Sequence, residues 1–178
     1  MRGLHARLPS YLINFHKVDS IADMNAYIAR IKEASRGIDQ LVERAKEVSK
    51  TAYAPYSQFY VGAAIRLSSN EIIEGSNQEN MAYPSGMCAE RVAIYYANSH
   101  HSDLEIKTIA ITAFAKDFDV DHPISPCGAC RQSMAEYEMK QKQPIRLIMT
   151  GESGEVYIAE SIETILPFMF NEIELKKE

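Results

Sequence analysis

Three cysteines and one glutamate lie in two short segments whose residue types could hold a metal. The first segment is Cys88-Ala89-Glu90, and the second contains Cys127 and Cys130 in the spacing C-x-x-C. The sequence holds 3 cysteines in all, and an odd number argues against a framework of disulfides. Zinc takes thiolate ligands in a tetrahedron, and structural sites normally have four protein ligands. With no fourth cysteine, the sequence predicts a catalytic Zn²⁺ site with one open position, one ion per subunit.

Glu90 follows the first cysteine by two residues, in the first turn of a predicted helix. From there its carboxylate would reach the open position without binding the metal. A carboxylate in this place can take a proton from water and pass it to a substrate, which typically accelerates a reaction about 10²–10⁴-fold. We therefore predict that Glu90 is the catalytic acid and base.

Arg91 is expected to offset the charge of the metal site. Three thiolates around Zn²⁺ give a negatively charged complex, which makes water there harder to deprotonate than in an all-histidine site. Arg91 directly follows Glu90, so it could hydrogen-bond a thiolate sulfur. The alternative is an ordinary surface ion pair, which is the usual place of an arginine.

Two other interpretations of the cysteines remain open at this stage. The C-x-x-C spacing at a helix start is also typical of thiol-redox proteins. Such a protein would bind no metal and would form a reversible disulfide between Cys127 and Cys130, but it would need neither Cys88 nor Glu90. A structural zinc site completed by His122 is the second alternative, and it predicts bound metal without turnover.

The rest of the chain must position these residues, and its pattern alternates strands with helices. Apolar residues at helical or strand spacing, with turn residues between them, define the predicted elements. Helices are expected over residues 38–53, 88–98 and 127–139, and strands over 61–67, 71–74, 106–114, 145–150 and 156–159, with a possible edge strand over 26–32. This order predicts a layered α/β domain, with helices packed on a mixed sheet.

Length and composition fit one globular domain. The 178 residues are 46% hydrophobic and 24% charged, and the net charge is −5. That charge argues against a nucleic-acid partner, and no apolar run is long enough to span a membrane. Residues 1–18 carry three cationic and no acidic side chains, but no apolar signal region follows. We expect a cytoplasmic protein, with residues 1–36 as an N-terminal extension and 37–178 as the domain.

The cysteine segments resemble the signature of the zinc nucleobase deaminases, C-A-E followed by P-C-x-x-C. The form Cys-Ala-Glu-Arg is similar to the small homotetrameric cytidine deaminases. The resemblance extends beyond the cysteines themselves, to Tyr53 to Ala64, Asn77 to Asn80, the second zinc block Ser125 to Gln132, and Leu166-Pro167 with Phe170. They span nearly everything from residue 38 to the end.

The resemblance implies a fold and a reaction. The fold is the three-layer α/β fold of cytidine deaminases, a mixed sheet with helices on both faces, in a homotetramer. The reaction is the zinc-dependent hydrolysis of cytidine and 2′-deoxycytidine to uridine and 2′-deoxyuridine with release of ammonia, in pyrimidine salvage. Glu90 would protonate N3 of cytosine and later help to protonate the departing amino group.

The resemblance also implies substrate contacts. Asn77 and Glu79 would hydrogen-bond the ribose hydroxyls, with Glu79 accepting from the 3′-OH, although side chains of these types often only solvate a hairpin end. Phe59 would pack on the pyrimidine ring, and Phe170 of a neighbouring subunit would help to close the pocket. For any single phenylalanine the alternative is core packing.

The base edge and the pocket rim complete the expected site. The N–H of Ala89 and the C=O of Ser125 would hold the base and the leaving ammonia, and Tyr83 would contribute across a subunit interface. Met81 departs from the family pattern, which usually has a small residue there. Among other enzymes, a deaminase of a modified cytosine nucleoside such as blasticidin S is the nearest alternative, and the Asn77-x-Glu79 segment together with Arg91 favours cytidine. The absence of a basic cluster argues against a nucleotide or polynucleotide deaminase.

Overall fold

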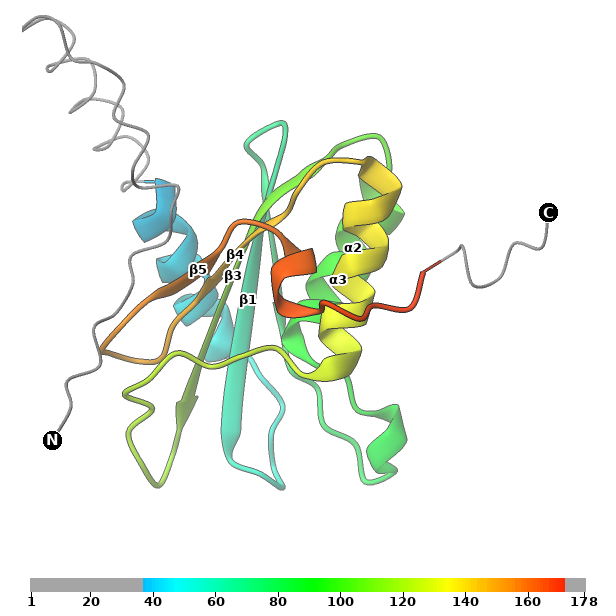
Figure 1. Ribbon diagram of the computed structural model, residues 1–178. Helices are drawn as coiled ribbons and strands as arrows, with labels where there is room; N and C mark the ends of the chain where they lie inside the picture. Colours follow the sequence, from blue (N-terminus) through cyan, green and yellow to red (C-terminus); the bar gives the residue numbers. More distant parts are fainter. Residues whose placement is uncertain (1–36, 172–178) are drawn as a thin grey trace, which may run out of the picture. The chain divides into compact units, whose positions relative to one another are not determined.

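The computed structural model describes residues 37–171, and Figure 1 shows how their elements are arranged. The possible edge strand over 26–32 and the extension 1–36 lie outside the described residues. Residues 37–49 are helical, and the other elements follow in chain order. They are β1 (Phe59–Leu67), β2 (Ile72–Ser76), the 3₁₀ turn η2 (Tyr83–Ser85), α2 (Ala89–His100), β3 (Ile106–Ala115), α3 (Gly128–Gln141), β4 (Arg146–Met149), β5 (Tyr157–Ala159) and the 3₁₀ turn η3 (Ile162–Ile165).

The five strands form one mixed sheet in the order β2-β1-β3-β4-β5. β1 pairs antiparallel with β2 and with β3, and β4 pairs antiparallel with β5. β3 and β4 are parallel, and α3 lies in the connection between them. Within the described residues, no helix is both long and apolar enough to cross a membrane.

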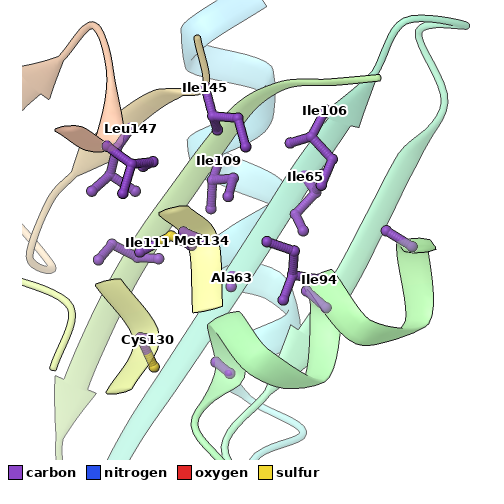
Figure 2. Close-up of a cluster of buried hydrophobic side chains, with 14 of the residues drawn as sticks. Ala63, Ile65, Ile94, Ile106, Ile109, Ile111, Cys130, Met134, Ile145 and Leu147 are labelled. Atoms are coloured by element: carbon purple, nitrogen blue, oxygen red, sulfur yellow. The ribbon is translucent and has the colours of Figure 1, made fainter. Parts of the chain in front are cut away.

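Helices cover both faces of the sheet (Figure 1). Successive residues of a strand point to opposite faces, so apolar residues on both faces must be buried against helices. On one face, alternate strand residues pack with buried residues of α2 and α3, and Figure 2 shows this cluster. Its strand members include Ala63, Ile65, Ile109, Ile111 and Leu147, and its helix members include Ile94, Cys130 and Met134. The residues between them, Ala64, Ala110 and Ile148, pack with Leu41, Val42 and Ala45 of the helix 37–49. The predicted three-layer α/β fold is therefore confirmed.

The predicted helix over 38–53 is wrong at its end, since the helix stops at residue 49. The hydroxyl of Thr51 donates to Val48 O at 2.8 Å in the turn that follows. Tyr53 then pairs with the site segment: its N–H donates to Asn77 O at 3.0 Å, and its C=O accepts from Glu79 N at 2.8 Å. Other boundaries differ from prediction by one to two residues. β1, for example, begins at Phe59 because that residue already pairs with β3.

Glu138 of α3 fastens the C-terminal part of the chain. Its carboxylate accepts from the backbone N–H groups of Ile145, Ile162 and Glu163, at 2.6, 2.9 and 3.1 Å, and from the hydroxyl of Ser161 at 2.8 Å. Hydrogen bonds to a charged acceptor are stronger than neutral ones. One side chain therefore ties the approach to β4 and the start of η3 to the helix that carries Cys130.

Gly62 lets the helix 37–49 approach the sheet closely. A Cβ atom at this position would lie 2.0 Å from Ala45 O and 2.8 Å from Ser49 N. We predict that Gly62→Ala lowers the free energy of unfolding by at least about 1–3 kcal/mol, because both clashes are with backbone. The urea midpoint at fixed protein concentration measures this. Gly37→Ala is the control, since nothing lies within 4 Å of its Cβ position. Equal midpoints for Gly62→Ala and the wild type would contradict the prediction.

Candidate metal centre and pocket

The three cysteine sulfurs gather in one cluster, called here the sulfur cluster. The Sγ atoms of Cys88 and Cys127 are 3.8 Å apart, and those of Cys127 and Cys130 are 3.5 Å apart. All three atoms lie within 4.8 Å of one another, and the cysteines are free rather than disulfide-bonded. Two sulfurs each about 2.3 Å from a tetrahedral zinc ion would be about 3.8 Å apart. The donor set and its spacing therefore fit zinc.

His122 does not join the sulfur cluster. Among the described residues, the group that could hold a metal consists of the three cysteines alone. The His122 side chain is exposed, and its Nδ1 lies 3.2 Å from Asp121 Oδ1. The geometry therefore gives no support to a four-ligand structural site completed by this histidine.

Two helix starts bring the sulfurs together. Cys88 is the N-cap residue of α2 and Cys127 is the N-cap residue of α3, while Cys130 lies in the first turn of α3. The first N–H groups of a helix have no intrahelical acceptor, and the helix dipole is positive at that end. Both effects favour thiolate over thiol.

The sulfurs and Arg91 are electrostatically coupled. Hydrogen bonding from Cys130 is the largest cause that lowers the pKa of Cys88, to about 5, and Arg91 adds to it with Nη2 at 3.7 Å from Cys88 Sγ. The same hydrogen bond and burial raise the pKa of Cys130. Within the described part of the chain, the Nε of Arg91 is buried without a hydrogen-bond partner. A guanidinium with an unused N–H donor beside the sulfurs would stabilise several thiolates at once.

Glu90 lies beside this cluster in the first turn of α2. Its side chain is buried, with 5% of the residue exposed, yet it lines the pocket described below. Burial is the main cause that raises the pKa of Glu90, and the negative charge of Cys88 raises it further. A carboxyl group in this environment holds a proton more readily than an exposed one, which suits a proton carrier.

A cavity of about 1050 Å³ opens over the sulfur cluster. Most of the residues expected from the sequence to form the site line it: Phe59, Asn77, Glu79, Cys88, Glu90, Arg91, Ser125 and Cys127. Tyr83 lines it as well. Ala89 is buried as the first residue of α2, where its N–H lacks an intrahelical acceptor. Phe170 and Met81 do not line the cavity of this subunit.

Asn77 and Glu79 hydrogen-bond backbone groups within residues 56–61, a segment that also lines the cavity. The Asn77 amide accepts from Val61 N at 2.7 Å and donates to Phe59 O at 3.0 Å. Oε2 of Glu79 accepts from the N–H groups of Tyr56 and Ser57 at 2.9 and 3.3 Å. Hydrogen bonding by Ser57 is the largest cause that lowers the pKa of Glu79, so this carboxylate stays charged. Both side chains thus hold backbone as well as facing the cavity.

Sequence reasoning did not assign roles to Tyr56 and Ser57. Both line the cavity, and the Ser57 hydroxyl accepts from Phe59 N at 3.1 Å. The Tyr56 ring meets the Tyr83 ring edge-on, with centroids 6.1 Å apart. The block from Tyr53 to Ala64 that carried the resemblance contains both residues, but nothing in their types or spacing indicated that they bind Glu79.

Comparisons with known proteins agree with this geometry. The family described as the cytidine and deoxycytidylate deaminase zinc-binding region matches residues 35–143. A cytidine deaminase of Sporosarcina psychrophila is 36% identical over 139 residues, which cover 78% of this chain and 94% of that protein. A blasticidin-S deaminase of Bacillus cereus is 30% identical over 134 residues, or 74% of this chain and 90% of that protein. The crystal structure of cytidine deaminase from Burkholderia pseudomallei is similar with a TM-score of 0.65 and 35% identity, covering 74% of this chain and 98% of that chain.

The contact between Arg91 and Cys88 generates a prediction about metal retention. We expect Arg91→Met to lower zinc affinity about 10–100-fold, as loss of a group that supports a metal ligand typically does. The measurement is the transfer of zinc to a chromogenic chelator at equilibrium. Arg146→Met is the matched control, because Arg146 pairs with Glu160 instead of contacting the cluster. Equal retention by Arg91→Met and wild type would show that the guanidinium does not stabilise the bound metal.

Proposed function

The chain belongs to the cytidine deaminase family, as the sequence resemblance predicted, and we propose that it hydrolyses cytidine and 2′-deoxycytidine to uridine and 2′-deoxyuridine with release of ammonia. Its cofactor is zinc, one ion per subunit, and the proposed role of the reaction is pyrimidine salvage. The observation that carries the proposal is the sulfur cluster with the buried carboxyl of Glu90 beside it, at the floor of a cavity lined by Asn77 and Glu79.

Cys88, Cys127 and Cys130 would hold the metal, which when bound lowers the pKa of water and so supplies a nucleophile at neutral pH. Glu90 accepts the proton that the attacking water loses at C4 of cytosine. It then delivers that proton to N3, and later assists protonation of the amino group, which leaves as ammonia. The raised pKa of Glu90 supports this role, because a carboxyl that both takes and gives protons near neutral pH needs one.

The walls of the cavity would orient the nucleoside. Glu79 accepts from the ribose 3′-OH, while its Oε2 also holds the two backbone amides. Asn77 offers its second amide N–H to the same part of the sugar. Phe59 packs on the pyrimidine ring. The N–H of Ala89 and the C=O of Ser125 bind the base edge and the departing ammonia.

We also propose a cytoplasmic homotetramer, in which Phe170 and Tyr83 complete the cavities of neighbouring subunits. Exposed aromatic side chains support this assembly, since Tyr83 and Phe170 are exposed in the isolated subunit. The net charge of −5 supports a nucleoside rather than a polynucleotide substrate.

A modified cytosine nucleoside is the second candidate substrate. The similarity to a blasticidin-S deaminase supports it. Asn77 and Glu79 favour cytidine, because their positions in the cavity suit hydroxyls of an unmodified ribose. Turnover of cytidine and blasticidin S, compared on one zinc-loaded preparation, decides between the two candidates.

Glu90→Gln tests the proton carrier. The amide is nearly isosteric but cannot take a proton, so we expect kcat to fall at least about 10²–10⁴-fold while zinc content stays at that of the wild type. Turnover is followed by the absorbance change from cytidine to uridine, and zinc is measured on the same sample. Glu136→Gln, an exposed change on α3, is the matched control. Near-native turnover of Glu90→Gln, purified free of other deaminases, would refute the assignment.

Glu79→Gln combined with 3′-deoxycytidine tests the sugar contact. For the wild type, we expect kcat/KM to be about 10- to 100-fold lower with 3′-deoxycytidine than with cytidine, the loss of a hydrogen bond to a charged group. In Glu79→Gln this ratio should shrink toward one, because the charged acceptor is already gone. If the ratio of kcat/KM between the two substrates is the same in Glu79→Gln as in the wild type, the carboxylate does not hydrogen-bond the 3′-OH.

A further inference from the structure

Two residues near the start of α3 hydrogen-bond the C-terminal segment of the chain, residues 165–170. The amide of Gln132 donates to Phe170 O at 2.7 Å and accepts from Phe170 N at 3.1 Å. Arg131 donates through Nη1 to Ile165 O at 3.2 Å. Both partners in the segment are backbone groups, so these contacts fix the course of the chain and leave the side chains between them free to point elsewhere.

The fixed segment presents aromatic rings outward. Phe168 is 98% exposed and Phe170 is 56% exposed, whereas Met169 between them packs against the core cluster. Exposing two phenylalanines costs free energy, and ordering the backbone that carries them costs more. Polar contacts that hold such a segment in place indicate that the position of its rings matters.

The same turn of α3 also holds the metal centre. Arg131 donates through Nε to Pro126 O at 2.9 Å, and Pro126 directly precedes Cys127. Cys130 precedes Arg131 in the same turn. The helix start that carries two of the three sulfurs therefore determines where the C-terminal segment lies.

We propose that Gln132 is a positioning residue: its amide fixes the backbone of Phe170, so that the ring is presented to the cavity of a second copy of this chain. This inference rests on the proposed function, in which Phe170 closes the cavity of a neighbour. Phe170 does not line the cavity of its own subunit, and its ring is exposed, which agrees with an outward role. Arg131 fastens the same segment upstream.

Gln132→Met tests the proposal, because methionine keeps the length of the side chain and removes both hydrogen bonds. We expect KM for cytidine to rise about tenfold, with kcat within about twofold of the wild type and zinc content unchanged. Phe170→Ala should raise KM at least as much. The double variant Gln132→Met/Phe170→Ala should be no worse than Phe170→Ala, since Gln132 acts only through that ring.

Hydrogen exchange gives a readout that does not depend on activity. The amide of Phe170 should lose its protection in Gln132→Met and keep it in Gln40→Ala, a control at an exposed residue of the helix 37–49. Gln132→Glu, which keeps the acceptor for Phe170 N and loses the donor to Phe170 O, should give intermediate protection and an intermediate KM. It also serves as the second variant should Gln132→Met fail to fold.

The outcomes separate the inference from the proposed function. A raised KM in Phe170→Ala with a wild-type KM in Gln132→Met overturns the positioning role and leaves the proposed function standing. Additive effects in the double variant, or unchanged exchange at the Phe170 amide, overturn it as well. A wild-type KM in Phe170→Ala removes both the proposed role of that ring and the inference. A wild-type protein that turns over no cytidine contradicts the proposed function itself.

Discussion

The mutual repulsion of closely spaced thiolates is the constraint on which the rest of this structure depends. Three sulfurs within 4.8 Å of one another can all be ionised only where positive potential surrounds them. Bound Zn²⁺ would supply most of this potential. The chain adds to it from two helix N-termini and from Arg91, which requires both helices to begin at the same place. Gly75 of β2 helps to achieve this, since a Cβ there would lie 2.7 Å from Ala89 O and from Ala93 N. Close approach of α2 to the sheet thus sets the position of Cys88.

The cavity wall is organised around the same point. Residues 77–79 lie between two neighbours: Tyr53 on one side, and Met87 on the other, where Gln78 N donates to Met87 O and Met87 N donates to Gln78 O, both at 2.8 Å. Met87 directly precedes Cys88. Backbone hydrogen bonds therefore connect the segment proposed to bind the sugar to the residue before the proposed metal ligand, and to the loop that follows the first helix. These hydrogen bonds fix the position of one part of the site relative to the other.

Much of this arrangement could be predicted from sequence, because its signals are local. The cysteines are N-caps or first-turn residues, the strands alternate, and Glu90 follows Cys88 by a fixed helical offset. What could not be predicted depends on contacts between distant segments. The early end of the first helix follows from the pairing of Tyr53 with Asn77 and Glu79, and the grip of Gln132 on Phe170 joins residues 38 positions apart. Neither contact can be inferred from the types or the spacing of the residues that make it.

The double use of Asn77 and Glu79 limits how this pocket can be altered. Each of these side chains, proposed to contact the sugar, also hydrogen-bonds backbone on either side of Phe59 or at Phe59 itself, whose ring is proposed to pack on the base. On the proposed function, a substitution of either residue that is chosen to admit a different sugar would also shift the backbone around Phe59, so the preferences for sugar and for base would be coupled. Met81 and Tyr83 take no part in these hydrogen bonds: both are largely exposed, at 82% and 77%, and Tyr83 touches this region through its ring contact with Tyr56. On the proposed function, substitutions at Tyr83, which lines the cavity, would change the sugar preference with less effect on the base than substitutions at Asn77 or Glu79.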